Sequence, residues 1–213
     1  PVGPVGGSAT QSFTRTFEGK TFVNESPGQT KWMDWGKDHY ATVTWSNAPD
    51  NRHIAIAWMS NWEYANQVPT KQFRSSNSVP RDLNLYTSNG ETYIQCKPSA
   101  ELLALRGKSQ TKESFQVERT YNLDEILADN NGTYELEMTI VNEEAEIVGF
   151  QLFNRKGEEV YCYYNLVEDK FYMDRTRSGM VDFSASFPAV TIAPIEKGKE
   201  FKLRLFVDRA SIE

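Results

Sequence analysis

Cysteine and histidine are scarce in this 213-residue sequence, which contains two of each. No C-x-x-C pair occurs, Cys96 and Cys162 lie far apart, and only His39 and His53 could join them, so zinc-ligand spacing is missing. We therefore predict no metal site. Buried free thiols are the expected state of the cysteines, and a structural rather than catalytic role is expected for the histidines.

Long apolar runs and an excess of basic residues are also missing. No stretch approaches the roughly 18 consecutive apolar residues of a membrane helix, so we predict no membrane span. Lys and Arg number 23 against 29 Asp and Glu, and the net charge is −6. This is the wrong sign for a protein that neutralises phosphates, which argues against a nucleic-acid partner.

Helical patterns are rare, and several familiar catalytic motifs are absent. The sequence contains no G-x-S-x-G, P-loop, G-x-G-x-x-G or H-E-x-x-H motif, so esterases, P-loop nucleotide enzymes and helix-borne zinc proteases lose their main support. Only 99–105 and 123–128 have helical character, and each allows a turn or two at most.

Alternation of apolar and polar residues is what the chain has in abundance, and it is typical of strands. Turn-forming segments such as Ser88-Asn89-Gly90 separate the alternating runs, as antiparallel hairpins require. The chain is therefore predicted to be almost entirely β. The expected strands lie at 39–45, 53–59, 82–86, 92–96, 133–141, 147–153, 160–166, 170–174 and 201–207.

The composition changes along the chain and predicts two regions. All five tryptophans fall within the first 62 residues, and 97–112 lacks alternation. We place one domain at 1–97, a linker at 98–112 and a second domain at 113–213. The Pro/Gly-rich start has no leader, and the last residues stop inside an apparent strand, so we expect a piece cut at both ends, with any signal peptide outside it.

The densest polar and aromatic cluster is WMDWGKDHY (32–40), followed by WMSNWEY (58–64). Tryptophan and tyrosine rings offer a flat apolar surface to a sugar, and carboxylates and amides bind its hydroxyls. A sugar site is one interpretation. The alternative is that the tryptophans pack in a β core while Asp34 and Asp38 bracket a turn at Gly36.

A second charged segment, Asp174–Gly179, carries two arginines beside an aspartate. It could hold an anion, but a charged hairpin turn is the simpler interpretation.

Several of these segments resemble glycoside hydrolase family 32, the levanases, exo-inulinases and β-fructofuranosidases. The runs at 33–47 and 54–86, with W-M-S-N-W-x-Y-A-N followed by P-R-x-L, are similar to the last part of the family's catalytic propeller. The runs at 171–187 and 201–213, with D-R-T-x-S-G and L-x-x-F-V-D-R-x-S-I-E, are similar to its C-terminal sandwich. The resemblance covers nearly the whole chain.

The resemblance implies an all-β fold, the end of a five-bladed β-propeller followed by an antiparallel β-sandwich. It also implies retaining hydrolysis of β-fructosidic bonds in fructans or sucrose, with no metal or organic cofactor. The family's nucleophile, transition-state stabiliser and acid/base lie in W-M-N-D-P-N-G, R-D-P and E-C motifs, and none of these occurs here. We therefore assign no catalytic residue and expect the chain alone to be inactive.

Residues of the substrate subsite can still be assigned through the resemblance. Trp62, with Asn61 and Trp58, matches the late propeller motif whose tryptophan lines the fructosyl subsite, and Asp38 with Tyr40 matches a segment at the rim of the same funnel. The expected role of Trp62 is to pack on the sugar ring and hold it in position.

The same resemblance implies the chain's partners. These are a fructan or sucrose substrate and the missing N-terminal propeller portion of the same protein, and the sandwich can also support a homo-oligomer. An extracellular or periplasmic location follows from the substrate class. Two alternatives stay open, a non-catalytic carbohydrate-binding module and a structural β-sandwich module without a ligand.

Overall fold

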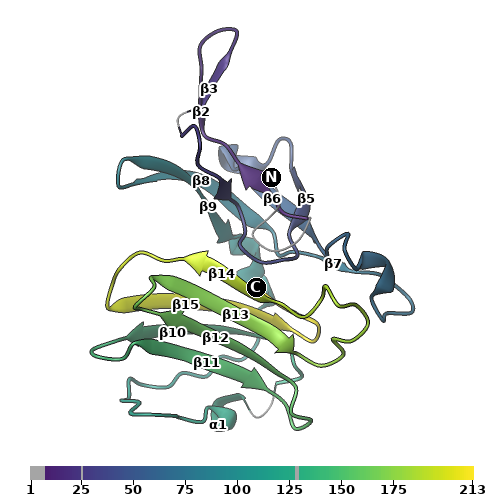
Figure 1. Cartoon of the computed structure of the whole chain (residues 1–213), viewed down its shortest axis with the longest axis vertical. Helices are drawn as coiled ribbons and strands as arrows, with labels where there is room; N and C mark the ends of the chain where they lie inside the picture. The colour runs from purple at the N-terminus through teal and green to yellow at the C-terminus, as the bar shows by residue number, and fades with distance from the viewer. Residues whose placement is uncertain (1–7, 25, 128–129) are drawn as a thin grey trace. The chain divides into compact units, whose positions relative to one another are not determined.

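The structure, a computed structural model, describes residues 8–24, 26–127 and 130–213, and strands dominate it (Figure 1). All nine predicted strands are present with ends shifted by at most a few residues. They are β5 (Tyr40–Thr44), β6 (Ile54–Met59), β8 (Arg81–Ser88), β9 (Glu91–Pro98), β10 (Tyr134–Val141), β11 (Ile147–Phe153), β12 (Glu159–Asn165), β13 (Lys170–Arg177) and β15 (Glu200–Asp208).

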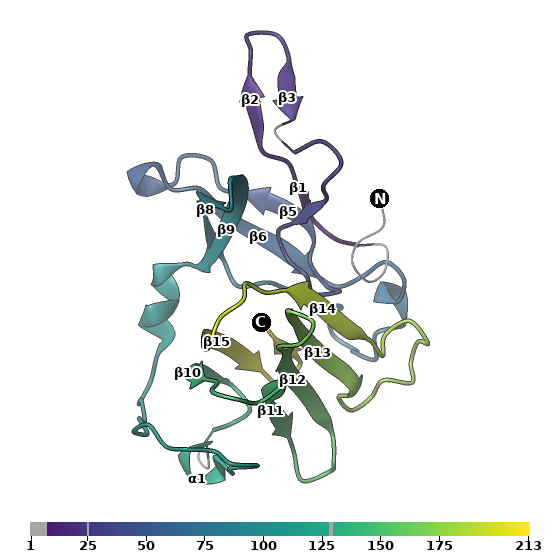
Figure 2. The same cartoon turned by 60° about the vertical axis from the view of Figure 1, so that its left-hand side comes forward.

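The first sheet is antiparallel, with the order β5-β6-β8-β9 (Figure 2). The short strand β7 (Ser76–Asn77) also pairs with β6. Its longest hairpin turns at Asn89 and Gly90, whose φ angles of 50° and 79° suit the tight turn predicted there. Ala55 and Ala57 on β6 are buried, and their small side chains form part of the core.

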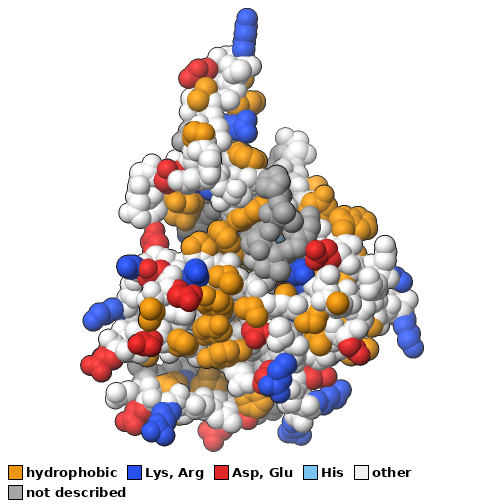
Figure 3. All heavy atoms as spheres, in the orientation of Figure 1, with side chains coloured by type: hydrophobic (Ala, Val, Ile, Leu, Met, Phe, Trp, Pro, Cys, Tyr) orange, Lys and Arg blue, Asp and Glu red, His pale blue; other side chains and the backbone are white. Residues whose placement is uncertain are grey.

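The second sheet has four antiparallel strands in the order β11-β12-β13-β14, with β14 at Val190–Pro194. Its strands alternate as predicted, so Cys162 and Tyr164 are buried while Tyr161 is exposed on the opposite face. Tyr161, Tyr163 and Tyr172 stack there, with ring centroids 4.9 and 4.8 Å apart. Hydrophobic side chains are visible over this sheet in Figure 3. The sheet thus has one core face and one face that retains exposed aromatic surface.

The third sheet pairs β10 with β15, and β15 with β16 (Ser211–Ile212). Leu136 lies opposite Leu205 and Met138 opposite Leu203, which places apolar pairs on one face. On the opposite face of this sheet, Glu135 accepts hydrogen bonds from Arg106 and Arg204. The two arginines lower the pKa of the Glu135 carboxyl, Arg106 having the larger effect.

The remaining elements are short, and alternation did not predict the strands among them. The two-residue strands β1 (Gln11–Ser12) and β4 (Lys31–Trp32) pair with each other, as do β2 (Arg15–Phe17) and β3 (Phe22–Asn24). The two helical segments predicted from the sequence are a 3-10 helix and a single α-helical turn. The helices are η1 (Pro49–Asn51), η2 (Ala65–Gln67), η3 (Ala100–Leu105) and α1 (Asp124–Leu127).

The chain forms two compact units. One combines the residues up to Ser99 with Glu143–Lys197, and the other combines Ala100–Asn142 with Gly198–Glu213. The first unit therefore joins the Trp-rich segments to the sheet of β11–β14 across the linker predicted at 98–112. The division into 1–97, 98–112 and 113–213 stays a prediction. Among the described residues, none of the helices is long and apolar enough to cross a membrane.

Gly149 on β11 allows the close approach of β12. A Cβ atom there would lie 2.2 Å from the Cys162 carbonyl oxygen and 2.6 Å from Tyr163 Cβ, which leaves no room for a methyl group. We expect Gly149→Ala to lower the free energy of unfolding by about 1–3 kcal/mol, because the strands must separate to accept the methyl group. Urea unfolding would measure the change.

Gly107→Ala is the control, because a Cβ at Gly107 meets no atom within 4 Å. It should change stability by no more than about 0.5 kcal/mol. Equal stability of the two variants would contradict the close packing at Gly149.

Candidate functional site

An aromatic cluster with one exposed ring lies where β6 leads into the following turn. Trp58, near the end of β6, pairs in register with Tyr40 on β5, and their ring centroids are 6.4 Å apart. The Trp62 ring lies 4.9 Å from that of Trp58 and is 63% exposed. Trp58 is fixed by its indole N–H, which donates to the Ser75 hydroxyl. The three predicted aromatic site residues are therefore neighbours, and Trp62 presents the largest open surface.

Asn61 lies next to this cluster and is fully buried. Its Nδ2 donates to the Lys37 carbonyl oxygen at 3.0 Å, and its Oδ1 accepts from the Glu63 N–H at 3.1 Å. The N–H of Trp62 donates to the buried Ser8 hydroxyl at 3.0 Å. The backbone on both sides of Trp62 is thus held by buried polar groups. Because both ends of the Asn61 amide are engaged, this residue orients the turn that carries Trp62.

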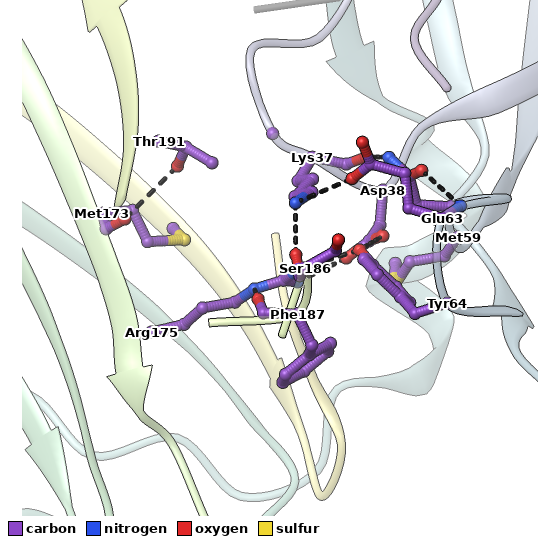
Figure 4. A network of polar contacts seen from close by, with 12 residues as sticks. Lys37, Asp38, Met59, Glu63, Tyr64, Met173, Arg175, Ser186, Phe187 and Thr191 are labelled. Atoms are coloured by element: carbon purple, nitrogen blue, oxygen red, sulfur yellow. Dashed lines mark hydrogen bonds and ion pairs between the residues drawn. The ribbon is translucent and has the colours of Figure 1, made fainter. Parts of the chain in front are cut away.

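Asp38 is engaged at both carboxylate oxygens. Oδ1 accepts from the Tyr64 hydroxyl and Oδ2 accepts from Arg175 Nη1 (Figure 4). Arg175 Nη2 also donates to the Tyr64 hydroxyl at 2.8 Å. Asp38, predicted at the rim of the funnel, therefore lies in a closed triangle with one arginine and one tyrosine.

The contacts within this triangle shift the pKa values of Tyr64 and Arg175. Burial raises the pKa of the Tyr64 hydroxyl, and the nearby Asp38 carboxylate raises it further. Burial alone would lower the pKa of Arg175, but Asp38 and Tyr64 outweigh it and the pKa lies above its usual range. Tyr64 is therefore neutral and Arg175 charged, which is the state in which both donate to Asp38.

Lys37 adds a second buried charge beside the triangle. Its Nζ lies 3.0 Å from Glu63 Oε2, donates to the Ser186 carbonyl oxygen, and lies 5.5 Å from the centre of the Tyr64 ring (Figure 4). The ammonium group is thus compensated by a carboxylate, a carbonyl and an aromatic face.

The charged hairpin turn predicted at Asp174–Gly179 is wrong. Residues 174–177 belong to strand β13, and the Arg175 side chain is largely buried against the Phe187 ring, 4.0 Å from its centroid. Sequence analysis missed this residue because its partner, Asp38, is 137 positions away. The D-R-T-x-S-G motif was the only available signal.

Asp34 has the structural role that the alternative interpretation gave it. Its Oδ1 accepts from the Gly36 N–H at 2.6 Å, which forms the turn, and its Oδ2 pairs with Arg81 at 2.6 Å. His39 is also structural, because it is buried and its Nδ1 lies 3.1 Å from the Thr10 hydroxyl. Both cysteines are free, Cys162 is buried, and burial raises its pKa to about 12.

The described residues contain no group of three or more His, Cys, Asp or Glu side chains able to hold a metal ion. The chemistry available at the site is therefore that of an exposed aromatic surface on a rigid polar base. Such a surface can bind the apolar face of a sugar ring.

Comparison with known proteins identifies the family. The model of the glycosyl hydrolases family 32 N-terminal domain matches residues 5–98, and that of the family 32 C-terminal region matches residues 101–213. The chain belongs to glycoside hydrolase family 32. The resemblance stated from the sequence motifs is thereby confirmed.

Family 32 relatives match the chain along its whole length. A levanase of Bacillus subtilis (strain 168) is 36% identical over 217 residues, which cover 98% of this chain and 32% of the levanase. An extracellular exo-inulinase of Aspergillus niger is 31% identical over 232 residues, which cover 100% of this chain and 42% of that enzyme. The chain thus spans less than half the length of these family 32 relatives.

Solved family 32 structures show the same fold. The exo-inulinase from Aspergillus awamori matches 99% of this chain and 43% of its own with a TM-score of 0.74 at 24% identity. A β-fructofuranosidase from Schwanniomyces occidentalis, complexed with fructosyl-erythritol, matches 100% of this chain and 45% of its own with a TM-score of 0.73 at 25% identity. The predicted fold class, the end of a propeller followed by a β-sandwich, is confirmed.

The buried His39 predicts a pH dependence of stability. Burial, with a smaller contribution from Arg81, lowers its pKa from 6.5 despite the opposing effect of Asp34. The unfolded chain therefore binds a proton first as the pH falls, so His39 contributes stability above pH 6.5 that is lost as the pH falls through the folded pKa. We expect His39→Asn to reduce the fall in urea-unfolding free energy between pH 7.5 and 5.

His53→Asn is the matched control, since His53 is exposed. It should keep the pH dependence of the unaltered chain. If the two variants show the same slope, His39 is not the group responsible.

Proposed function

We propose that this chain is the C-terminal part of a family 32 hydrolase that cleaves β-fructosidic bonds in fructans or sucrose, and that it supplies one wall of the fructosyl subsite. The observation that carries the proposal is the 63% exposed Trp62 ring beside the completely buried Asn61. A large aromatic side chain left open on a rigid polar base suits stacking on a sugar. The printed names of the relatives, levanase and exo-inulinase, support the fructan class.

The subsite residues divide by their contacts. Trp62, Trp58 and Tyr40 present ring surface to the sugar, and their spacing of 4.9 and 6.4 Å makes a continuous aromatic wall. Asn61 and Asp38 hold the wall from behind, since their polar atoms already bond to the protein. Positioning of the sugar, rather than proton transfer, is the contribution of this chain.

The catalytic carboxylates lie outside this chain in our proposal. Retaining glycosidases need a nucleophile and an acid/base on either side of the scissile bond. The W-M-N-D-P-N-G, R-D-P and E-C motifs are absent from the sequence. Asp82, which follows an arginine as the stabilising aspartate would, is bound by Arg52 through two hydrogen bonds of 2.6 and 2.7 Å. The N-terminal propeller portion of the same protein would then supply both groups.

The setting of the whole protein follows from the same proposal. It would act outside the cell or in the periplasm, because fructans are large polymers and relatives are named extracellular exo-inulinases. No metal or organic cofactor is required by the chemistry. The stacked tyrosines on the sheet of β11–β14, of which Tyr161 is exposed, are compatible with a homo-oligomer.

A non-catalytic carbohydrate-binding module is the second candidate. It is favoured by the same observation, an open aromatic wall in a chain without the catalytic motifs. Activity after addition of the N-terminal propeller portion distinguishes the two, since only a hydrolase part would then release fructose.

The purified chain should release no fructose from sucrose, inulin or levan. Reducing-sugar release would be measured for the unaltered chain and for Asp38→Asn together, because Asp38 is the only carboxylate among the residues assigned to the subsite. Release that disappears in Asp38→Asn would place catalysis within this chain and contradict the proposal.

Trp62→Ala should weaken inulin binding by about tenfold, since a contact on the face of an aromatic ring contributes on the order of 1 kcal/mol. Isothermal titration calorimetry with inulin measures the affinity. Trp45→Ala is the matched control, because Trp45 is also exposed and lies outside the wall. Equal loss in both variants would contradict a specific subsite at Trp62.

A further inference from the structure

We propose that Arg175, on strand β13, is a positioning residue for the sugar-binding wall and acts on Trp62 through Asp38 and Tyr64. The inference rests on the proposed function, because it gives the wall its supporting residue. It also gives the sheet of β11–β14 an indirect part in the subsite, since that sheet contributes no ring to the wall.

The guanidinium group of Arg175 is fixed in every direction. Nε donates to the Phe187 carbonyl oxygen at 2.9 Å, Nη1 donates to Asp38, and Nη2 donates to the Tyr64 hydroxyl at 2.8 Å. Its plane lies against the Phe187 ring, 4.0 Å from the centroid. An arginine held at all three nitrogens and on one face has a single orientation, so it can define the places of its partners.

Two short paths lead from Arg175 to the turn that carries Trp62. Tyr64 is two residues beyond Trp62, and its N–H donates to the Asn61 carbonyl oxygen at 3.1 Å. Asp38 follows Lys37, whose carbonyl oxygen accepts from Asn61 Nδ2 at 3.0 Å. Both paths end at Asn61, the buried residue directly before Trp62. A shift of Asp38 and Tyr64 would therefore be passed to the indole ring.

The segment before β14 supports the same turn from a second direction. Lys37 donates to the Ser186 carbonyl oxygen and pairs with Glu63 at 3.0 Å. The neighbouring carbonyl, that of Phe187, accepts from Arg175. Successive residues of this segment thus bind the two cations that flank the Trp62 turn, which explains why the contact is specific rather than a single surface ion pair.

The test combines Arg175→Lys with Trp62→Ala in a double-mutant cycle. Lysine keeps the positive charge beside Asp38, so the fold is retained, but it cannot reach Tyr64 and Phe187 at the same time. Arg177→Lys is the matched control, since Arg177 is on the same strand with a side chain that is 71% exposed and pairs with Glu159. Circular dichroism and urea unfolding report the fold of each variant.

Two properties would be measured for each variant, the affinity for inulin and the accessibility of Trp62 to acrylamide. The chain has five tryptophans. The contribution of Trp62 is therefore the part of the acrylamide quenching that disappears when Trp62 is replaced by alanine. We expect Arg175→Lys to weaken inulin binding about tenfold and to alter Trp62 quenching, with neither effect in the Trp62→Ala background. Arg177→Lys should change neither property. A residue that is only structural would lower stability in both backgrounds without changing these two signals.

The outcomes separate this inference from the proposed function. If the unaltered chain binds no inulin but Arg175→Lys still alters Trp62 quenching, the proposed subsite fails and the positioning role stands. If inulin binds and Trp62→Ala abolishes binding, while Arg175→Lys changes neither affinity nor quenching, the proposed function stands and the positioning role is overturned. Equal effects of Arg175→Lys in both backgrounds overturn it as well.

Discussion

The buried triangle of Asp38, Tyr64 and Arg175 is the constraint on which the rest of the first unit depends. It joins three segments that are remote in sequence, and each member donates to or accepts from the other two. Removing either charged member leaves the other charge largely desolvated and without its ion-pair partner, which is far more costly than the loss of a surface ion pair. The segments around residues 38, 64 and 175 therefore fold against each other together.

The triangle also explains an inversion of the usual arrangement of side chains. Asn61 is wholly buried, whereas the adjacent Trp62 is 63% exposed. Large apolar side chains ordinarily enter the core, and amides ordinarily remain in water. Here the polar groups form the interior of the turn because hydrogen bonds satisfy them, and the indole is left outside. Such local disagreement with the general pattern is typical of functional sites, where rigidity and exposure are required together.

Sequence reasoning succeeded where the signal was local. Alternation and turn residues such as Asn89-Gly90 predicted nine strands, because side-chain period and turn geometry depend on neighbouring residues. It missed β1 and β4, since a strand of two residues has no period, and it missed β14, which contains Thr191 and Ala193 in place of large apolar residues on its inward parity. The aromatic members of the site were found because tryptophans cluster in sequence.

The contact between Asp38 and Arg175 could not be predicted from the sequence, for a physical reason. The Asp38 carboxylate has the same chemical character whether it meets a sugar hydroxyl or a guanidinium group, and only the fold decides which is near. The same holds for Arg175, whose motif resembles a charged turn until β13 is seen to continue through residue 177.

The place of Arg175 in β13 follows from the two ladders that this strand makes, an irregular one with β12 and a regular one with β14. Glu159 pairs with Arg177 and Tyr161 with Asp174, so two steps along β12 correspond to three along β13. The extra residue is a β-bulge, which bends a strand and changes where its side chains point. Regular alternation had already set Met173 on the core side and Asp174 on the other. On the β14 side the ladder stays in register, because the Arg175 N–H donates to the Ala189 carbonyl oxygen at 3.1 Å, one step beyond the pairing of Asp174 with Val190. Arg175 thus keeps the core-side parity of Met173, and alternation along β13 turns its side chain toward Asp38 and Tyr64.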